Sequence, residues 1–258
     1  MLELNTIYNE DCLTGMGNID DASIDCIICD LPYGTTANEW DSVIPLDELW
    51  RQYERVLTDI GTVILFGSEP FSSYLRMSNI CLYKYDWIWR KSKPTGFTHA
   101  KNKPLKDYEI ISVFSKGTTN HAGMSAKRMI YNPQGVEHCN ILKHNGAGKF
   151  GSLVGEYKKK KETYMQTMTN YPRMILDDFR KDSDSWHPTQ KPVNLIRYLI
   201  RTYTQEGGVI LDNCMGSGTT AIACIRENRN FIGFELNKEY YIKSIKRIIE
   251  EQRQLKLF

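Results

Sequence analysis

Residues 209–224 read VILDNCMGSGTTAIAC. The apolar residues before Asp212 predict a short buried strand, the two glycines predict a tight turn, and the residues that follow have the composition of a helix. Glycines between a strand and a helix let the backbone approach a ligand closely, while the helix offers free N–H groups. Glu235 follows the next apolar run, residues 231–234. Open α/β sheets bind ligands where their strands end, so Asp212 and Glu235 are candidate ligand contacts.

Working outward from this turn, apolar runs of strand length recur at residues 24–29, 62–66, 108–114, 209–211 and 231–234. Helical spacing of apolar residues appears between them, at residues 46–57, 195–203, 219–225 and 240–249. This alternation predicts an α/β fold with a mostly parallel sheet. The rhythm breaks over residues 116–186, a segment too long for an ordinary loop. We therefore expect one α/β domain, residues 1–115 and 187–258, interrupted by an insert, residues 116–186.

The composition is that of an ordinary globular protein, and 258 residues suffice for one substantial core. No apolar run reaches the roughly 18 residues of a membrane span, and the N-terminus lacks the basic and apolar pattern of a secretory signal. A cytoplasmic protein with no membrane partner is expected. The seven cysteines are odd in number and scattered, unlike a disulfide framework. Cys26 and Cys29 have no second pair at zinc-ligand spacing, and no metal site is expected.

A second turn, Asp30-Leu31-Pro32-Tyr33, follows the apolar run at residues 24–29. Pro32 keeps Leu31 extended and makes the turn rigid. The Asp30 carboxylate and the Leu31 carbonyl can then hold both N–H groups of an amino group on a planar base. Such an amino group is a poor nucleophile, and two acceptors favour a pyramidal nitrogen with an available lone pair, so catalysis rests on positioning and electrostatics. Tyr33 offers a ring on which an extruded base can stack.

With both turns in view, the chain resembles the amino-methyltransferase family of DNA modification enzymes. The catalytic tetrapeptide of that family is [DNS]-P-P-[YFW], and residues 30–33 match three of its four positions. Its cofactor turn, D-P-F-x-G-S-G-T-T, resembles residues 212–220, and its signature H-P-T-Q-K-P is intact at residues 187–192. The order of the motifs is that of the family's β group. The resemblance implies a Rossmann-like, S-adenosylmethionine-dependent methyltransferase sheet with an inserted target-recognition region.

The resemblance also implies the catalytic roles of the tetrapeptide. Asp30 would accept from the target amino group, Pro32 would shape the turn, and Tyr33 would stack on the flipped base. Leu31 replaces the first proline of the family motif, but its contact is made through a backbone carbonyl, so the chemistry should survive.

Three segments and Glu235 would hold S-adenosylmethionine. The glycine turn would surround its methionine end, Glu235 would hold its ribose, the H-P-T-Q-K-P segment would approach its carboxylate, and an N-terminal segment would contact its adenine. Asn213 and Cys214 replace the usual Pro and Phe, and Met215 is expected to compensate in the packing. In chain order, the implied cofactor residues are Asp11, Cys12, His187, Thr189, Lys191, Asp212, Gly216, Ser217, Gly218, Thr219 and Glu235.

Basic residues concentrate in two parts of a chain whose net charge is only +2. Residues 84–106 hold seven lysines and arginines against one acid, Asp86, with aromatic residues between them. The insert adds further basic residues, including the lysine run at residues 158–161. Concentrated positive charge suits DNA phosphates, so we expect residues 116–186 to recognise the target. Deleting the lysine run should weaken binding to all DNA and flatten its salt dependence.

Asp30 favours adenine N6 as the target, because N4-cytosine members of the family more often begin the tetrapeptide with Ser. N4-cytosine methylation is one alternative, and a DNA-binding protein that has kept the cofactor fold without activity is another. Cytosine C5 methylation requires a nucleophilic Cys, typically in a Pro-Cys pair that this sequence lacks. RNA and protein-glutamine methyltransferases usually carry the cofactor turn first. The expected partners are DNA and, by analogy with the β group, a second copy of the chain and a cognate restriction enzyme.

Overall fold

The computed structural model describes residues 2–34, 42–120, 125–144, 149–150, 157–158, 163–177, 179–180, 182–183, 186–187 and 189–255. Pro188 of the H-P-T-Q-K-P segment and residues 159–161 of the lysine run lie outside these ranges. The chain forms two compact units, the first of Met1–Asn132 and Met174–Phe258 and the second of Pro133–Arg173.

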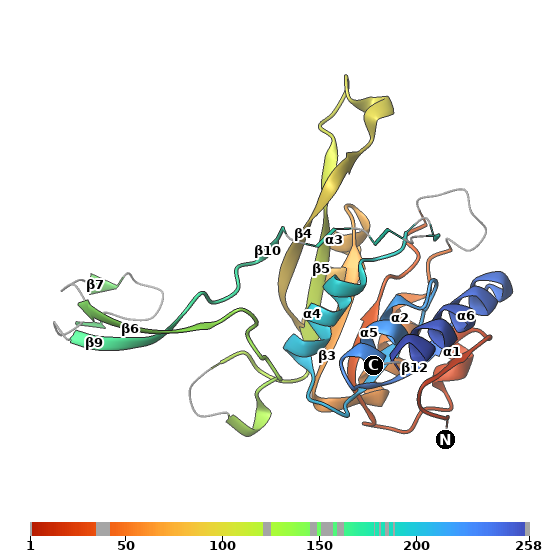
Figure 1. The fold of residues 1–258 in the computed structure, drawn as a ribbon, viewed down its shortest axis with the longest axis horizontal. Helices are drawn as coiled ribbons and strands as arrows, with labels where there is room; N and C mark the ends of the chain where they lie inside the picture. Colours follow the sequence, from red (N-terminus) through yellow and green to blue (C-terminus); the bar gives the residue numbers. More distant parts are fainter. Residues whose placement is uncertain are drawn as a thin grey trace. The chain divides into compact units, whose positions relative to one another are not determined.

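The first unit is built on an eight-stranded sheet with the order β1-β12-β11-β2-β3-β5-β4-β10 (Figure 1). Only β5 runs antiparallel to its neighbours, which are β3 and β4, and all other pairs are parallel. The mostly parallel sheet predicted from the sequence is therefore confirmed. The strands are β1 Thr6–Tyr8, β2 Ile24–Cys29, β3 Leu57–Gly67, β4 Tyr83–Thr95, β5 Lys106–Ser115, β10 Ile175–Leu176, β11 Val209–Asp212 and β12 Asn230–Phe234.

Six α-helices flank the sheet within the described residues, in the order α1 Cys12–Met16, α2 Leu46–Val56, α3 Phe71–Ser78, α4 Val193–Tyr203, α5 Thr219–Arg226 and α6 Lys238–Leu255. Apolar residues of α4, α5 and α6 share one core cluster, and those of α1, α2 and α3 share another. The continuous apolar sequence of β2 follows from this arrangement, because its alternate side chains enter different clusters. Cys26 and Ile28 enter the first, and Ile27 and Cys29 enter the second.

Strands β4 and β5 form a long hairpin that extends past the end of the sheet and is yellow at its tip (Figure 1). The register still pairs Thr95 with Lys106 beyond the sheet, and the short 3₁₀ turn η1, Phe97–His99, lies between the two strands. The sequence predicts only the buried part of β5, since exposed residues at the tip follow no apolar period.

The second unit consists of two antiparallel strand pairs. Strand β6 (Glu137–His144) pairs with β9 (Thr163–Thr169), and β7 (Lys149–Phe150) pairs with β8 (Tyr157–Lys158). This unit is shorter than the insert expected at residues 116–186. The flanks of the insert belong to the first unit because Met129 and Leu176 are buried in its core, and because β10 pairs with β4.

Candidate active site

Three acidic residues meet at one edge of the sheet. Strands β12, β11 and β2 are neighbours and run parallel, so their carboxyl ends lie side by side. Asp212 is the last residue of β11, Glu235 directly follows β12, and Asp30 directly follows β2. The sequence-based expectation that ligand contacts gather at this edge therefore has a simple topological origin.

A cavity of about 580 Å³ opens at this edge, within the size range of small-molecule sites. Its wall contains every residue of the catalytic tetrapeptide and every predicted cofactor residue except Gly218. We call the part around Asp212, Gly216 and Glu235 the glycine-turn end, and the part around Asp30, Tyr33 and Lys191 the tetrapeptide end. Further lining residues that the sequence did not single out include Ile28, Phe66, Gln190, Ile196, Leu236 and Tyr240.

At the glycine-turn end, both oxygens of the Glu235 carboxylate accept backbone N–H groups. The N–H of Gly216 donates to Oε2 at 2.7 Å, and that of Asn237 donates to Oε1 at 2.8 Å. Burial raises the pKa of Glu235, while these two hydrogen bonds work in the opposite direction. The carboxylate is thus held in one orientation with lone pairs left over, as a partner for vicinal hydroxyl groups requires.

Asp212 is more deeply buried, and its Oδ1 accepts the N–H of Cys214 at 3.1 Å. Burial raises the pKa of Asp212 to about 7, against which hydrogen bonds from Thr220 and Cys214 act only partly. No lysine or arginine in the described part of the chain pairs with Asp212 or Glu235. This end of the cavity therefore suits a ligand that carries positive charge of its own.

Two glycines shape the packing around the turn. Gly218 has a φ of +77°, and a Cβ there would lie 3.1 Å from Cβ of Ser244 on α6. Gly218 thus lets α5 approach α6, and its predicted contact with a cofactor stays a prediction. A Cβ on Gly233 would lie 2.3 Å from Cε of Met215, so this glycine makes room for the methionine. Met215 is buried against it and lines the cavity, as expected for a residue that compensates for the missing Phe.

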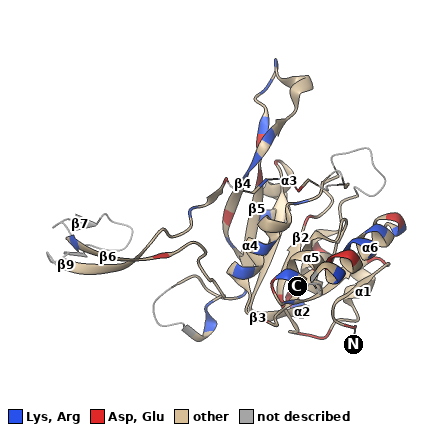
Figure 2. Cartoon of the chain, viewed as in Figure 1, with Lys and Arg blue, Asp and Glu red and all other residues tan. Residues whose placement is uncertain are grey.

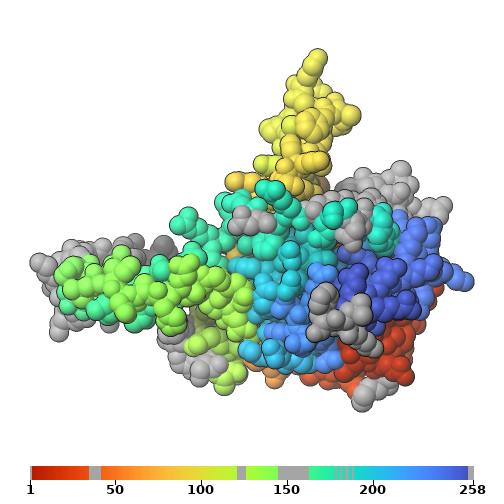
Figure 3. Space-filling model, viewed as in Figure 1, coloured from red at the N-terminus to blue at the C-terminus, as the bar shows by residue number. Residues whose placement is uncertain are grey.

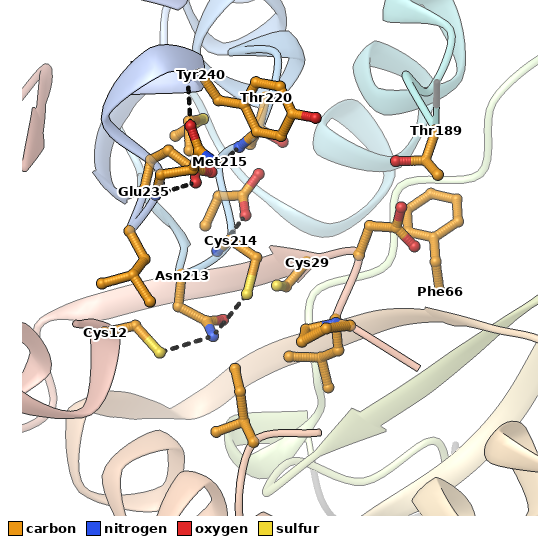
Figure 4. A pocket seen from close by; sticks show the side chains of 18 of the residues that line it. Cys12, Cys29, Phe66, Thr189, Asn213, Cys214, Met215, Thr220, Glu235 and Tyr240 are labelled. Carbon is orange, nitrogen blue, oxygen red and sulfur yellow. Dashed lines mark hydrogen bonds between the residues drawn. The ribbon is translucent and has the colours of Figure 1, made fainter. Parts of the chain in front are cut away.

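Around Asn213, three cysteines from separate segments converge. The Asn213 amide lies 3.6 Å from both Cys12 Sγ and Cys214 Sγ, and these two side chains point toward it in Figure 4. The thiols of Cys12 and Cys29 each interact with that of Cys214. The contact with Cys214 and burial both raise the pKa of Cys12, whereas the pKa of Cys29 is raised by burial against the lowering effect of Cys214. The pKa of Cys214 is raised by its contact with Cys29 and by burial, against its contact with Cys12, so all three thiols are packed neutral groups.

The neighbouring Asp11 has a local structural role. Its Oδ1 accepts the N–H of Thr14 at 2.9 Å and so caps the first turn of α1. Asp11 and Cys12 both line the cavity, but their predicted contact with a cofactor adenine stays a prediction.

At the tetrapeptide end, the Asp30 carboxylate has two side-chain donors. The Tyr33 hydroxyl donates to Oδ1 at 2.6 Å, and the Lys191 ammonium donates to Oδ2 at 2.5 Å. Tyr33 is also stacked on Phe71 with ring centroids 5.0 Å apart. The sequence predicted Lys191 beside the cofactor carboxylate, which stays a prediction; in the structure its ammonium lies on Asp30, the predicted catalytic aspartate.

Lys191 also lies 3.3 Å from Oε2 of Glu109, whose Oε1 forms an ion pair with Lys91. Burial raises the pKa of Asp30, and Lys191 opposes this effect. Burial also acts to raise the pKa of Glu109, but the two ammonium groups outweigh it and lower that pKa. Burial acts to lower the pKa of Lys191, which its two carboxylate partners raise overall. Lys191 therefore stays charged.

The rest of the H-P-T-Q-K-P segment also lies at the cavity. The His187 ring stands edge-on to Tyr240, with centroids 4.5 Å apart, and its Nδ1 lies 3.3 Å from the backbone nitrogen of Thr189. Gln190 is 5% exposed, and neither its Oε1 nor its Nε2 has a hydrogen-bond partner among the described residues. Burying an amide without hydrogen-bond partners costs free energy, so we expect a ligand to supply the partners of Gln190. The sequence analysis quoted Gln190 within the motif without assigning it a role.

The parallel sheet, the glycine turn and a cavity bounded by a rigid acidic turn together define a Rossmann-like methyltransferase fold. A model of the DNA methylase family matches residues 24–247, which is most of the chain. The chain belongs to this family of N6/N4 DNA methyltransferases, and S-adenosylmethionine is its cofactor. The cavity fits that molecule, because Glu235 can accept ribose hydroxyls and the unpaired Asp212 can face a cationic group.

Two relatives match this chain over most of their lengths, and two solved structures share its fold. The type II methyltransferase M1.MboII of Moraxella bovis is 29% identical, with 93% of this chain and 95% of the relative covered. The DNA adenine methyltransferase YhdJ of Escherichia coli K12 is 26% identical, with 95% and 83% covered. The crystal structure of the M1.HpyAVI–SAM complex is 24% identical with a TM-score of 0.60 and covers 94% of this chain and 98% of its own. The cytosine-N4-specific PvuII DNA methyltransferase is 14% identical with a TM-score of 0.62, over 96% and 91%.

No helix in the described ranges is both long and apolar enough to span a membrane. Those residues also contain no group of three or more His, Cys, Asp or Glu side chains arranged to hold a metal ion.

Proposed function

We propose that this DNA methyltransferase modifies N6 of adenine in DNA. The observation that carries the proposal is the Asp30 carboxylate, which lines the cavity at the end of β2 and already holds an N–H donor, the Lys191 ammonium. A carboxylate that accepts from a cationic nitrogen is well suited to accept from an amino nitrogen that becomes cationic during methyl transfer.

S-adenosylmethionine supplies an electrophilic methyl group on a sulfonium. The protein's contribution is to hold the target nitrogen, with Asp30 and the Leu31 carbonyl as acceptors and Tyr33 beside the base. A target nitrogen that has gained the methyl group would be more acidic, and the Asp30 carboxylate would take up the proton that it loses. Burial raises the pKa of Asp30, so this carboxylate is a better proton acceptor than an exposed one.

Two features support adenine as the base. The tetrapeptide begins with Asp, whereas the N4-cytosine members of the family more often have Ser there. In addition, YhdJ, a relative aligned over most of this chain, is a DNA adenine methyltransferase. N4-cytosine methylation uses the same positioning chemistry and is the alternative that the test must separate.

The β4–β5 hairpin is part of the proposed DNA-binding surface. Lys93, Lys101 and Lys103 are exposed on it, and blue segments recur along its length (Figure 2). On the face shown in Figure 3, nothing packs over the yellow tip, where Phe97 is 67% exposed. Phosphate contacts from these lysines would make DNA binding salt-dependent. The proposal keeps residues 116–186 as the region that recognises the target sequence.

The test is a nucleoside-resolved methylation assay. The purified chain is incubated with unmethylated genomic DNA and S-adenosylmethionine carrying a labelled methyl group, and the digested DNA is analysed by mass spectrometry. Label in N6-methyladenine is the expected result. Label in N4-methylcytosine would correct the base, and cofactor binding without label on DNA would favour an inactive DNA-binding protein.

The proposal extends to the setting of the reaction. We place the reaction in the cytoplasm, and the β-group resemblance adds a homodimer and a cognate restriction enzyme as partners. Light scattering of the purified chain checks the dimer, since a monomer mass at micromolar concentration would contradict it.

A further inference from the structure

Both oxygens of the carboxylate that the target amino group needs already accept a side-chain donor. Tyr33 donates to one oxygen of Asp30 and Lys191 donates to the other. Lys191 is only 8% exposed, and its ammonium lies 5.1 Å from the centre of the Phe66 ring, on the neighbouring strand β3. A base whose amino group is to reach Oδ2 of Asp30 therefore competes with this ammonium for the same oxygen.

A second carboxylate lies next to the ammonium. Glu109 comes from β5, the strand beyond β3, and is only 8% exposed. Its Oε1 is paired with Lys91, whereas its Oε2 has no hydrogen bond in the described part of the structure and lies 3.3 Å from the Lys191 ammonium. Glu109 thus has an open acceptor on the side facing Lys191.

We propose that Lys191 occupies the amino-group position on Asp30 until the target base enters, and that Glu109 is the positioning residue that then receives the ammonium. The inference rests on the proposed function only in requiring an exocyclic amino group, so it holds for adenine N6 and for cytosine N4. Glu109 does not line the cavity and acts through Lys191.

The exchange is possible because every buried charged group keeps an ion-pair or hydrogen-bond partner in either state, Asp30 retaining the Tyr33 hydroxyl. Without a base, the ammonium bridges Asp30 and Glu109. With a base, a neutral amino group takes the place on Asp30, and Lys191 completes its hydrogen bond to Glu109 by a small side-chain movement. Asp30 and Glu109 are the two anionic partners of Lys191 among the described residues. If Glu109 were neutral, a Lys191 ammonium that moved away from Asp30 would therefore be buried without an anionic partner.

The first test is Glu109→Gln, which keeps the shape and removes the charge. Lys191 should then stay on Asp30, so kcat should fall about tenfold or more, because removing one partner of a buried ion pair costs at least that factor. Affinity for S-adenosylmethionine and KM for genomic DNA should stay close to wild type, since Glu109 touches neither. Glu54→Gln is the matched control, because Glu54 is an exposed carboxylate on α2 that does not line the cavity.

Two further variants separate positioning from a merely structural role. Glu109→Asp keeps the charge and should retain more of the wild-type kcat than Glu109→Gln. If the Gln variant is unstable, the kcat of Glu109→Asp still tests the role of the charge. In the double variant Lys191→Met, Glu109→Gln, the competing ammonium is gone, so kcat should exceed that of Glu109→Gln alone. A simple folding defect would make the double variant worse.

A wild-type kcat in Glu109→Gln, or a double variant no faster than that single variant, would overturn the inference. A wild-type chain that binds cofactor but methylates no base would instead overturn the proposed function.

Discussion

At and behind the tetrapeptide end of the cavity two carboxylates alternate with two lysines. At the glycine-turn end two carboxylates have backbone N–H donors, and no ammonium of the described residues pairs with them. Both ends are buried beside the carboxyl ends of the same strands, so they differ in the charge of the ligand that each can bind. A carboxylate neutralised by its own lysine is ready for a neutral partner that can replace the lysine. A carboxylate without a cation is ready for a ligand that brings one.

This difference gives the two ends separable functions. The glycine-turn end should control binding of the cationic cofactor, and the tetrapeptide end should control the chemical step. Variants at one end should therefore leave the measured property of the other end nearly unchanged, unless a charge acts across the cavity.

The largest effect is expected from Asp30→Ala, which removes the acceptor from the tetrapeptide end. Methyl transfer should fall by a factor of about 10² to 10³ or more, the usual loss when a positioned electrostatic contact is deleted. Calorimetric titration with S-adenosylmethionine should still show binding, because Glu235 and Asp212 are untouched. If affinity for the cofactor is lost together with activity, the two ends are not separable.

Asp212→Asn tests the glycine-turn end through its pH dependence. Burial raises the pKa of Asp212 from 3.8 to about 7, so the folded carboxyl holds its proton more tightly than the unfolded one. Ionised Asp212 therefore destabilises the free protein most above pH 7, and this penalty shrinks as the pH falls from 7 and is gone below about 3.8, where the unfolded carboxyl is protonated too. The cationic cofactor needs ionised Asp212, so affinity for the cofactor should fall as the pH falls, while the stability of the free protein rises.

For the wild type, affinity for S-adenosylmethionine should fall by up to about tenfold per pH unit below 7. In Asp212→Asn it should be weaker at pH 8 and nearly flat down to pH 6. Titration calorimetry at pH 6, 7 and 8 measures both proteins. A variant with the wild-type slope would assign the titration to another group.

Gln190→Met tests whether the buried Gln190 amide lacks hydrogen-bond partners until a ligand binds. Methionine has a similar length and no amide, so the ligand-free protein should gain about 1–3 kcal/mol of stability when an unsatisfied buried amide is removed. Methyl transfer should become slower, because the ligand loses its partner. Thermal unfolding without ligand checks the first expectation. An unchanged or lower Tm would mean that the amide is satisfied in solution.

The sequence predicted which acidic residues lie at each end of the cavity, but not the ion pairs at the tetrapeptide end. Asp212 and Glu235 follow apolar runs, and parallel strands must end at one edge, so their proximity follows from local pattern alone. Every predicted strand lies within an observed one, and each predicted helix overlaps an observed helix. Asp30 was found in the same way.

Glu109 was not found, although it lies in a strand that the sequence predicted. Glu109 lies beside Lys191 because β5 inserts antiparallel between β3 and β4. The spacing of apolar residues in the sequence predicts strands but not their order in the sheet. Gln190 was quoted but assigned no role, because its lack of partners depends on how a segment without regular structure is buried. The motif showed that Lys191 belongs to the site, and only the fold showed which carboxylate it contacts.

The smallest effect concerns the cysteines near the glycine-turn end. If this end is desolvated, Cys12, Cys29 and Cys214 should resist thiol reagents, because burial raises the pKa of Cys29 to about 12 and the other two also shift upward. Cys81 is exposed, and Cys139 is half-buried in the second unit, so these two should supply the fast phase with Ellman's reagent at pH 8. Cys81→Ser should remove part of that phase, which controls for the assignment. A fast phase that includes pocket cysteines and is suppressed by S-adenosylmethionine would mean that water enters the glycine-turn end readily. The contrast between the two ends would then rest on their charge partners alone, without a difference in solvation.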